Sequence, residues 1–184
     1  MADIKYADIL RNQHFNQFAA LFSVAMSPQW RMKHPSVPSV RETLELRLSK
    51  LNRSLSKEAT AIRNTFVYEL VKMLTDIVEA DPKLRYSSAD LDWLYSTIDA
   101  DTASVTFAMM FAVASTPREY LSAEQVAEIT GDAPSTWRAR AADRKIAGAF
   151  KAGKTWMFPI LSLRAYGVSV PDAMAIAPES DLIP

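Results

Sequence analysis

The placement of glycine constrains the fold of this chain more than any other feature of its sequence. All of its glycines lie within residues 120–168, at Gly131, Gly148, Gly153 and Gly167. Glycine enters left-handed backbone conformations without a steric penalty, so it marks tight turns and the ends of elements. We therefore expect short elements joined by tight turns in this region, and a different organisation in the first two thirds of the chain, which has no glycine.

The first of these short elements is a helix that begins after Ser122. Serine is a favourable N-cap, and Gln125 stands at the spacing that a capping box requires. Val126 and Ile129 are three residues apart and give this helix an apolar face. Gly131 then ends it.

A second helix is expected over residues 133–142, after so short a turn that the pair predicts a helix-turn-helix. Asp132 can cap this helix, and Pro134 is tolerated in its first turn, where the missing N–H has no helical partner. Trp137 and Ala141 are four residues apart and share the face that we expect to be buried. The outward side chains are the candidate DNA readers: Ser135, Thr136, Arg138 and Ala139.

A basic hairpin and a closing helix are expected next. Residues 146–150 and 155–158 are strand-like runs on either side of Lys151-Ala152-Gly153-Lys154, which has the composition of a short hairpin loop. Pro159 ends the second strand. This order of elements predicts a module that reads DNA.

The segment resembles the excisionase-type winged helix-turn-helix, which is related to the DNA-binding domain of the MerR family. The matching residues are Leu121-Ser122, Val126-Ala127-Glu128, Gly131, Ser135-Thr136, Gly153-Lys154, Trp156, Phe158-Pro159, Leu163 and Tyr166. The resemblance covers about a quarter of the chain. It implies a bacterial, plasmid or phage protein that binds double-stranded DNA, either as a transcriptional regulator or as an architectural accessory of recombination.

Four positions depart from the family pattern. The family often has serine at the position of Ala133, and basic residues at the positions of Pro134 and Ala139. Arg138 and Arg140 are therefore the side chains expected to reach the bases. The family often has a turn glycine where this chain has Arg144, so Arg144 must adopt an unusual backbone angle or the turn must differ.

Basic residues are concentrated in this region, although the whole chain has 21 basic and 21 acidic residues. Residues 134–166 contain seven Lys or Arg and one acid, Asp143, which is the concentration that phosphate neutralisation requires. The predicted DNA-binding residues are Ser135, Thr136, Arg138, Arg140, Arg144, Lys145, Lys151 and Lys154.

Individual roles follow from side-chain chemistry and from the resemblance. Arginine matches guanine O6 and N7 in the major groove, which assigns base reading to Arg138. The resemblance places Lys151 and Lys154 at the tip of the wing, against phosphates or in the minor groove. Trp137 and Trp156 are expected to pack inward instead of contacting bases.

Composition excludes several other classes of protein. The apolar fraction of 49% suits a folded soluble protein, and no apolar run approaches the eighteen residues of a membrane span. The chain has two histidines, no cysteine, no glycine-rich phosphate loop and no metal-ligand spacing. We expect no enzymatic activity, no cofactor and no metal, and a cytoplasmic, nucleoid-associated location.

Residues 1–114 are expected to form a helical oligomerisation domain, followed by a winged helix-turn-helix domain over residues 118–168 and a tail over residues 169–184. The boundary is expected at residues 115–117, so the fold class is mainly α with a small β-hairpin. Oligomerisation is the expected role of the first domain, because two-fold symmetric dimers read two half-sites. Residues 31–57 hold seven basic and two acidic residues, which allows a second phosphate-facing patch.

Within the first domain, helical periodicity predicts a helix over residues 3–26, and three prolines then predict a loop over residues 28–38. Residues 40–80 are expected to form one long helix or two helices joined near residues 54–56. A helix capped by Ser88 and an apolar helix over residues 103–114 complete the domain.

Two alternatives to a DNA-binding regulator remain open. The first is a scaffold whose basic wing binds a protein partner, and the second is an adaptor subunit of a nucleic-acid-processing complex.

Overall fold

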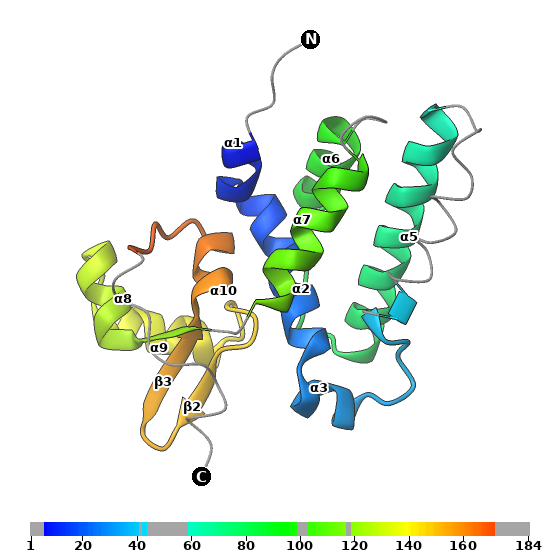
Figure 1. Cartoon of the computed structure of the whole chain (residues 1–184). Coiled ribbons are helices and arrows are strands. Elements are labelled where there is room, and N and C mark those ends of the chain that lie inside the picture. The colour runs from blue at the N-terminus through cyan, green and yellow to red at the C-terminus, as the bar shows by residue number, and fades with distance from the viewer. Residues whose placement is uncertain (1–5, 41, 44–58, 99–102, 117–118, 172–184) are drawn as a thin grey trace. The chain divides into compact units, whose positions relative to one another are not determined.

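The computed structural model describes residues 6–40, 42–43, 59–98, 103–116 and 119–171 (Figure 1). Over these ranges the chain is mainly helical, with a small three-stranded antiparallel sheet. The chain divides into two compact units: unit 1 is Met1–Ala20 with Thr116–Pro184, and unit 2 is Leu21–Ser115. The chain thus passes from unit 2 to unit 1 close to the expected boundary at residues 115–117, and residues 1–20 belong to unit 1.

Unit 2 is built from helices. It contains the end of α2 (Gln13–Met26), followed by α3 (Pro28–Lys33), α5 (Ala59–Ala80), α6 (Ser88–Thr97) and α7 (Ala103–Ser115). Helices α5 and α7 pack against each other, and the rings of Phe66 and Phe107 meet edge to face with their centroids 5.6 Å apart. None of the described helices combines the length with the apolar composition that a membrane-spanning segment requires.

The helix predicted over residues 3–26 is interrupted at Asn12. Helix α1 (Tyr6–Arg11) ends there and α2 begins at Gln13. The Asn12 Oδ1 atom accepts hydrogen bonds from the backbone N–H groups of His14 at 2.8 Å and Phe15 at 3.3 Å. Asparagine is a strong N-cap, so its side chain starts a new helix where the apolar periodicity alone predicts continuation.

The loop predicted over residues 28–38 contains helix α3, so that prediction is wrong in part. Ser27 caps the helix by accepting a hydrogen bond from the Trp30 N–H at 3.3 Å, and Pro28 occupies its first turn. Proline ends helices but is also well suited to the first helical position. The buried Trp30 donates from Nε1 to Asp81 Oδ2 at 3.1 Å and thereby ties α3 to the residue that follows α5.

The remaining helical predictions for residues 1–114 have mixed outcomes. Helix α6 is capped by Ser87 and not by Ser88, because Ser87 forms a reciprocal capping box with Asp90. The apolar helix predicted over residues 103–114 is confirmed by α7. The predicted junction near residues 54–56 lies outside the described residues.

The sheet of unit 1 has the strand order β1-β3-β2, with both pairs antiparallel. Its strands are β1 (Tyr120–Ser122), β2 (Phe150–Ala152) and β3 (Thr155–Pro159), and a short helix α10 (Ile160–Ala165) follows. The predicted second strand and closing helix are confirmed. The prediction of the first hairpin strand over residues 146–150 is wrong except at Phe150.

The error in the first hairpin strand has a physical cause. Ladder pairing continues to Ala152 and Thr155, which leaves a two-residue turn with Gly153 at φ 59°. Two-residue hairpin turns require positive φ, and Gly153 supplies it. Ile146 is buried in the core of unit 1. Strand β1 has no counterpart among the sequence predictions, because three residues are too few to show an alternating pattern.

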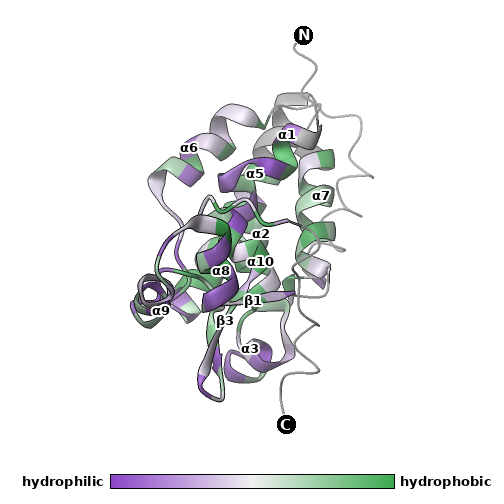
Figure 2. Cartoon of the chain, turned by 90° about the vertical axis from the view of Figure 1, so that its left-hand side faces the viewer, coloured by the Kyte–Doolittle hydropathy of each residue, from purple (hydrophilic) through white to green (hydrophobic). Residues whose placement is uncertain are grey.

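One apolar core joins the elements of unit 1 that lie between residues 120 and 170. It contains Leu121, Ala123, Val126, Ala127, Trp137, Ala141, Ile146, Phe158, Ile160, Leu163, Val168 and Val170. These residues come from β1, α8 (Ala123–Thr130), α9 (Pro134–Ala142), the segment between α9 and β2, β3, α10 and the segment after α10. In Figure 2 the tip of the β2–β3 hairpin is hydrophilic. The core therefore fixes the helices against the sheet and leaves the hairpin tip in solvent.

Candidate nucleic-acid interface

The candidate site is built on helices α8 (Ala123–Thr130) and α9 (Pro134–Ala142). The expected capping box at α8 is confirmed: Ser122 N–H donates to Gln125 Oε1 at 2.8 Å, and Gln125 N–H donates to Ser122 Oγ at 3.3 Å. Gly131 ends α8 with φ 75°. Both ends of α8 are thus set by local chemistry.

Asp132 does not cap α9, which corrects the sequence-based expectation. The residue at the N-cap position is Ala133, whose side chain cannot accept a hydrogen bond. The Asp132 carboxylate instead accepts a hydrogen bond from Arg140 Nη1 at 2.8 Å. The Asp132 side chain is therefore used in an ion pair with Arg140 and does not cap α9.

Trp137 anchors α9 to unit 1, as expected. Its side chain is almost fully buried, and its Nε1 donates to Thr130 Oγ1 at 3.1 Å. Its ring meets the rings of Phe158 and Tyr166 edge to face, at centroid distances of 6.2 Å and 5.7 Å. Trp156 packs against the same core from β3, which confirms its expected inward role.

Arg140 is held by contacts inside unit 1. Its guanidinium carbon lies 4.4 Å from the ring centroid of Trp137 and 5.4 Å from that of Tyr166. Together with the Asp132 hydrogen bond, these cation–π contacts leave the Arg140 side chain 26% exposed. The same residues line an open hollow of about 380 Å³ with Ile129, Gly167 and Val168. The sequence predicts that Arg140 reaches the bases. In the structure, its contacts with Asp132, Trp137 and Tyr166 also give it a structural role within unit 1.

Arg138 is exposed and forms an ion pair with Glu124 of α8. The two side chains are 50% and 54% exposed, so the pair lies at the surface. The pKa of the Glu124 carboxyl is below its ordinary value, mainly because of a hydrogen bond from its own backbone N–H, and also because Arg138 donates to it. Sequence reasoning missed Glu124, because no local pattern brings it to Arg138.

The hairpin presents two exposed lysines. Lys151 is opposite Trp156 in the β2–β3 register, and its Nζ lies 5.4 Å from the indole centroid. Lys154 follows Gly153 in the turn and is exposed. Neither lysine has an ion pair within the described ranges. Both positive charges are therefore available to an anionic partner.

Arg144 adopts the left-handed conformation, with φ 59°, which confirms the first of the two alternatives for this residue. Its N–H donates to Ala141 O at 3.0 Å, and the Lys145 N–H donates to Arg140 O at 2.9 Å. These two bonds form a Schellman motif, in which the left-handed position is usually glycine. Gly167 holds the equivalent position at the end of α10, where the N–H of Val168 donates to Leu163 O at 2.9 Å.

All eight predicted site residues lie in unit 1, on α9, on the turn that follows it and on the hairpin. Ser135 is exposed and Thr136 is half-buried in the first turn of α9. Arg138, Arg140 and Lys145 have carboxylate partners, the last being Asp143 at 3.5 Å. Arg144, Lys151 and Lys154 have none among the described residues.

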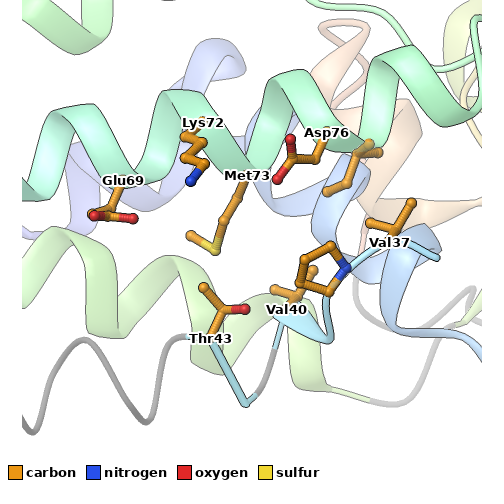
Figure 3. Close-up of a pocket in the computed structure, with 9 residues that line it drawn as sticks. Val37, Val40, Thr43, Glu69, Lys72, Met73 and Asp76 are labelled. Carbon is orange, nitrogen blue, oxygen red and sulfur yellow. The ribbon is translucent and has the colours of Figure 1, made fainter.

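Unit 2 contains a smaller pocket, of about 160 Å³. Figure 3 shows its apolar wall of Val37, Val40 and Met73, with Glu69, Lys72 and Asp76 projecting from α5. Its volume suits a few water molecules or a small ligand. In the described part of the chain, no three His, Cys, Asp or Glu residues are grouped so that they could hold a metal ion.

Comparisons with protein-family models, with curated proteins and with solved structures found no match for this chain. A functional assignment therefore depends on the geometry and charges of unit 1.

Proposed function

We propose that the chain binds double-stranded DNA, with unit 1 acting as a winged helix-turn-helix. In this assignment α9 enters the major groove and the β2–β3 hairpin lies along the backbone or in the minor groove. The main support for the proposal is that α9 has one buried face and one exposed face. Trp137 and Ala141 are buried, while Ser135 and Arg138 are exposed. A helix held on one face and polar on the other suits the width of the major groove.

The charges around α9 support this assignment. Arg144, Lys151 and Lys154 are exposed and have no carboxylate partner among the described residues. If each neutralises one phosphate, the logarithm of the binding constant should fall with the logarithm of salt concentration with a slope of about −3 for each protomer. Ser135 and Thr136, in the first turn of α9, supply hydroxyl groups for a phosphate or a single base.

The proposed mechanism is occlusion or bending of DNA without covalent chemistry, in a regulator of transcription or an architectural factor of recombination. A homo-oligomer is proposed because two symmetric copies can read two half-sites. Selection of bound sequences from random duplexes tests this point directly. Palindromic sites together with a dimer in sedimentation support it, and single half-sites bound by a monomer contradict it.

Removal of both hairpin charges tests the binding mode. Lys151→Ala with Lys154→Ala should weaken binding to every duplex alike and reduce the magnitude of the salt slope by roughly two. The matched control is Lys72→Ala with Lys83→Ala, which removes two exposed charges from unit 2 outside the basic residues 31–57. Equal effects of the two double variants would place the hairpin away from DNA.

The alternative functions give different results in the same experiment. A scaffold that binds a protein through its basic hairpin should show no salt-dependent affinity for duplex DNA. An adaptor subunit should bind DNA weakly alone and recruit an enzyme. Absence of duplex binding by the intact chain would overturn the proposed function.

A further inference from the structure

We infer that Glu124 is a positioning residue for DNA selectivity, which holds Arg138 so that it favours a base edge over a phosphate. This inference rests on the proposed function. The two residues are fourteen positions apart, and the packing of α8 against α9 brings them together. Both side chains are about half exposed, so the pair lies at the surface of unit 1.

The chemistry of the guanidinium explains how one ion pair can separate two kinds of DNA contact. Arginine has five N–H donors in a fixed plane, so Nη2 of Arg138 can donate to Glu124 while other donors face guanine O6 and N7. A phosphate in the same place would bring a second negative charge against the Glu124 carboxylate. The ion pair is therefore compatible with a contact between Arg138 and a base edge. It disfavours a contact between Arg138 and a phosphate, which is not specific for sequence.

Glu124 is ionised when this selection matters. Hydrogen bonds from its own backbone N–H and from Arg138 lower the pKa of its carboxyl, which stays deprotonated at neutral pH. The carboxylate lies in the first turn of α8, where the helix dipole also favours negative charge. It is therefore held in place in the free protein, before any DNA arrives.

The second ion pair of α9 differs from the first and provides a matched control. Arg140 has an acidic partner, Asp132, but its guanidinium also lies over the rings of Trp137 and Tyr166. Loss of Asp132 leaves these cation–π contacts in place, so Arg140 should stay where it is. Asp132→Asn thus removes one negative charge from the same module without releasing an arginine.

The experiment compares binding to a site selected from random duplexes with binding to an unselected random duplex of equal length. Glu124→Gln should raise affinity for the random duplex by roughly 2- to 5-fold, the range that one exposed ion pair allows. The salt slope on that duplex should become steeper by about one, because Arg138 is free to meet a phosphate. Affinity for the selected site should change less, so the ratio of the two affinities falls.

The dependence on Arg138 separates positioning from simple repulsion. In an Arg138→Ala background, Glu124→Gln should leave the ratio of affinities unchanged. If the ratio falls equally in that background, or if Asp132→Asn lowers it as much, Glu124 acts only as a nearby negative charge and the inference is wrong. An unchanged ratio in the single variant would also overturn it, while the proposed function would stand if the intact chain binds DNA. Equal unfolding midpoints of Glu124→Gln and the wild type verify that the fold is intact.

Discussion

Replacing Arg144 by glycine should make the protein more stable and a weaker DNA-binding protein at the same time. Arg144 holds the left-handed position of the Schellman motif that ends α9, and it is exposed. Among the described residues it is the one non-glycine with positive φ. Strained backbone positions persist where the surrounding structure compensates for them, and they cluster at functional sites.

The magnitude follows from two opposing terms. A left-handed conformation costs an L-residue roughly 1 to 2 kcal/mol, which glycine avoids. Glycine in turn increases the conformational entropy of the unfolded chain, which costs about 0.4 to 1 kcal/mol. The net expectation for Arg144→Gly is a gain of up to about 1.5 kcal/mol in the free energy of unfolding, or a few degrees in the unfolding midpoint for a chain of this size.

Two further variants separate strain from charge. Arg144→Gln keeps the strain and removes the charge, and Arg144→Lys keeps both. Urea unfolding should therefore show a gain for glycine alone, with the other two variants within about 0.5 kcal/mol of the wild type. Duplex binding should weaken for both the glycine and glutamine variants, with the magnitude of the salt slope lower by about one, and stay unchanged for lysine.

Each half of this prediction can fail separately. A glycine variant that is less stable than the wild type would show that the positive φ of Arg144 is not the source of strain. Unchanged affinity and salt slope in the glutamine variant would show that Arg144 does not contact DNA. With the second result, DNA binding would no longer explain why an arginine occupies a position that favours glycine.

Two further substitutions test other parts of the proposal. Arg138→Ala should reduce the binding free energy by about 1 to 3 kcal/mol on the selected site and by much less on random DNA. The preference at one base position in each half-site should also relax. Equal losses of binding free energy on both DNAs would instead assign Arg138 to a phosphate contact. Phe15→Ala should reduce the free energy of unfolding by about 3 to 5 kcal/mol and impair DNA binding, because Phe15 is fully buried in the N-terminal part of unit 1. Leu10→Ala, at a 42% exposed position nearby, is the control; a Phe15 variant that unfolds like this control would show that residues 1–20 do not stabilise unit 1.

Several features of unit 1 depend only on residues close together in the chain, and these could be predicted from the sequence. The Ser122–Gln125 capping box, the end of α8 at Gly131 and the inward direction of Trp137 all follow from sequence, and the structure confirms them. Capping requires only a side chain three residues from its target, and helical periodicity assigns a face from residues three and four apart. Local rules failed where two local signals compete, as at Asn12, where capping overrides the apolar periodicity.

The partners of the charged side chains in the candidate site could not be predicted from the sequence, because they depend on how the elements pack together. Glu124 meets Arg138 because α8 packs against α9, and Tyr166 meets Arg140 because the end of α10 lies beside the Trp137 ring. Strand β1 and the inclusion of residues 1–20 in unit 1 could not be predicted from the sequence either, since both depend on contacts between segments far apart in the chain. An ion pair depends on the positions of two side chains in space, and sequence spacing fixes those positions only within a single element.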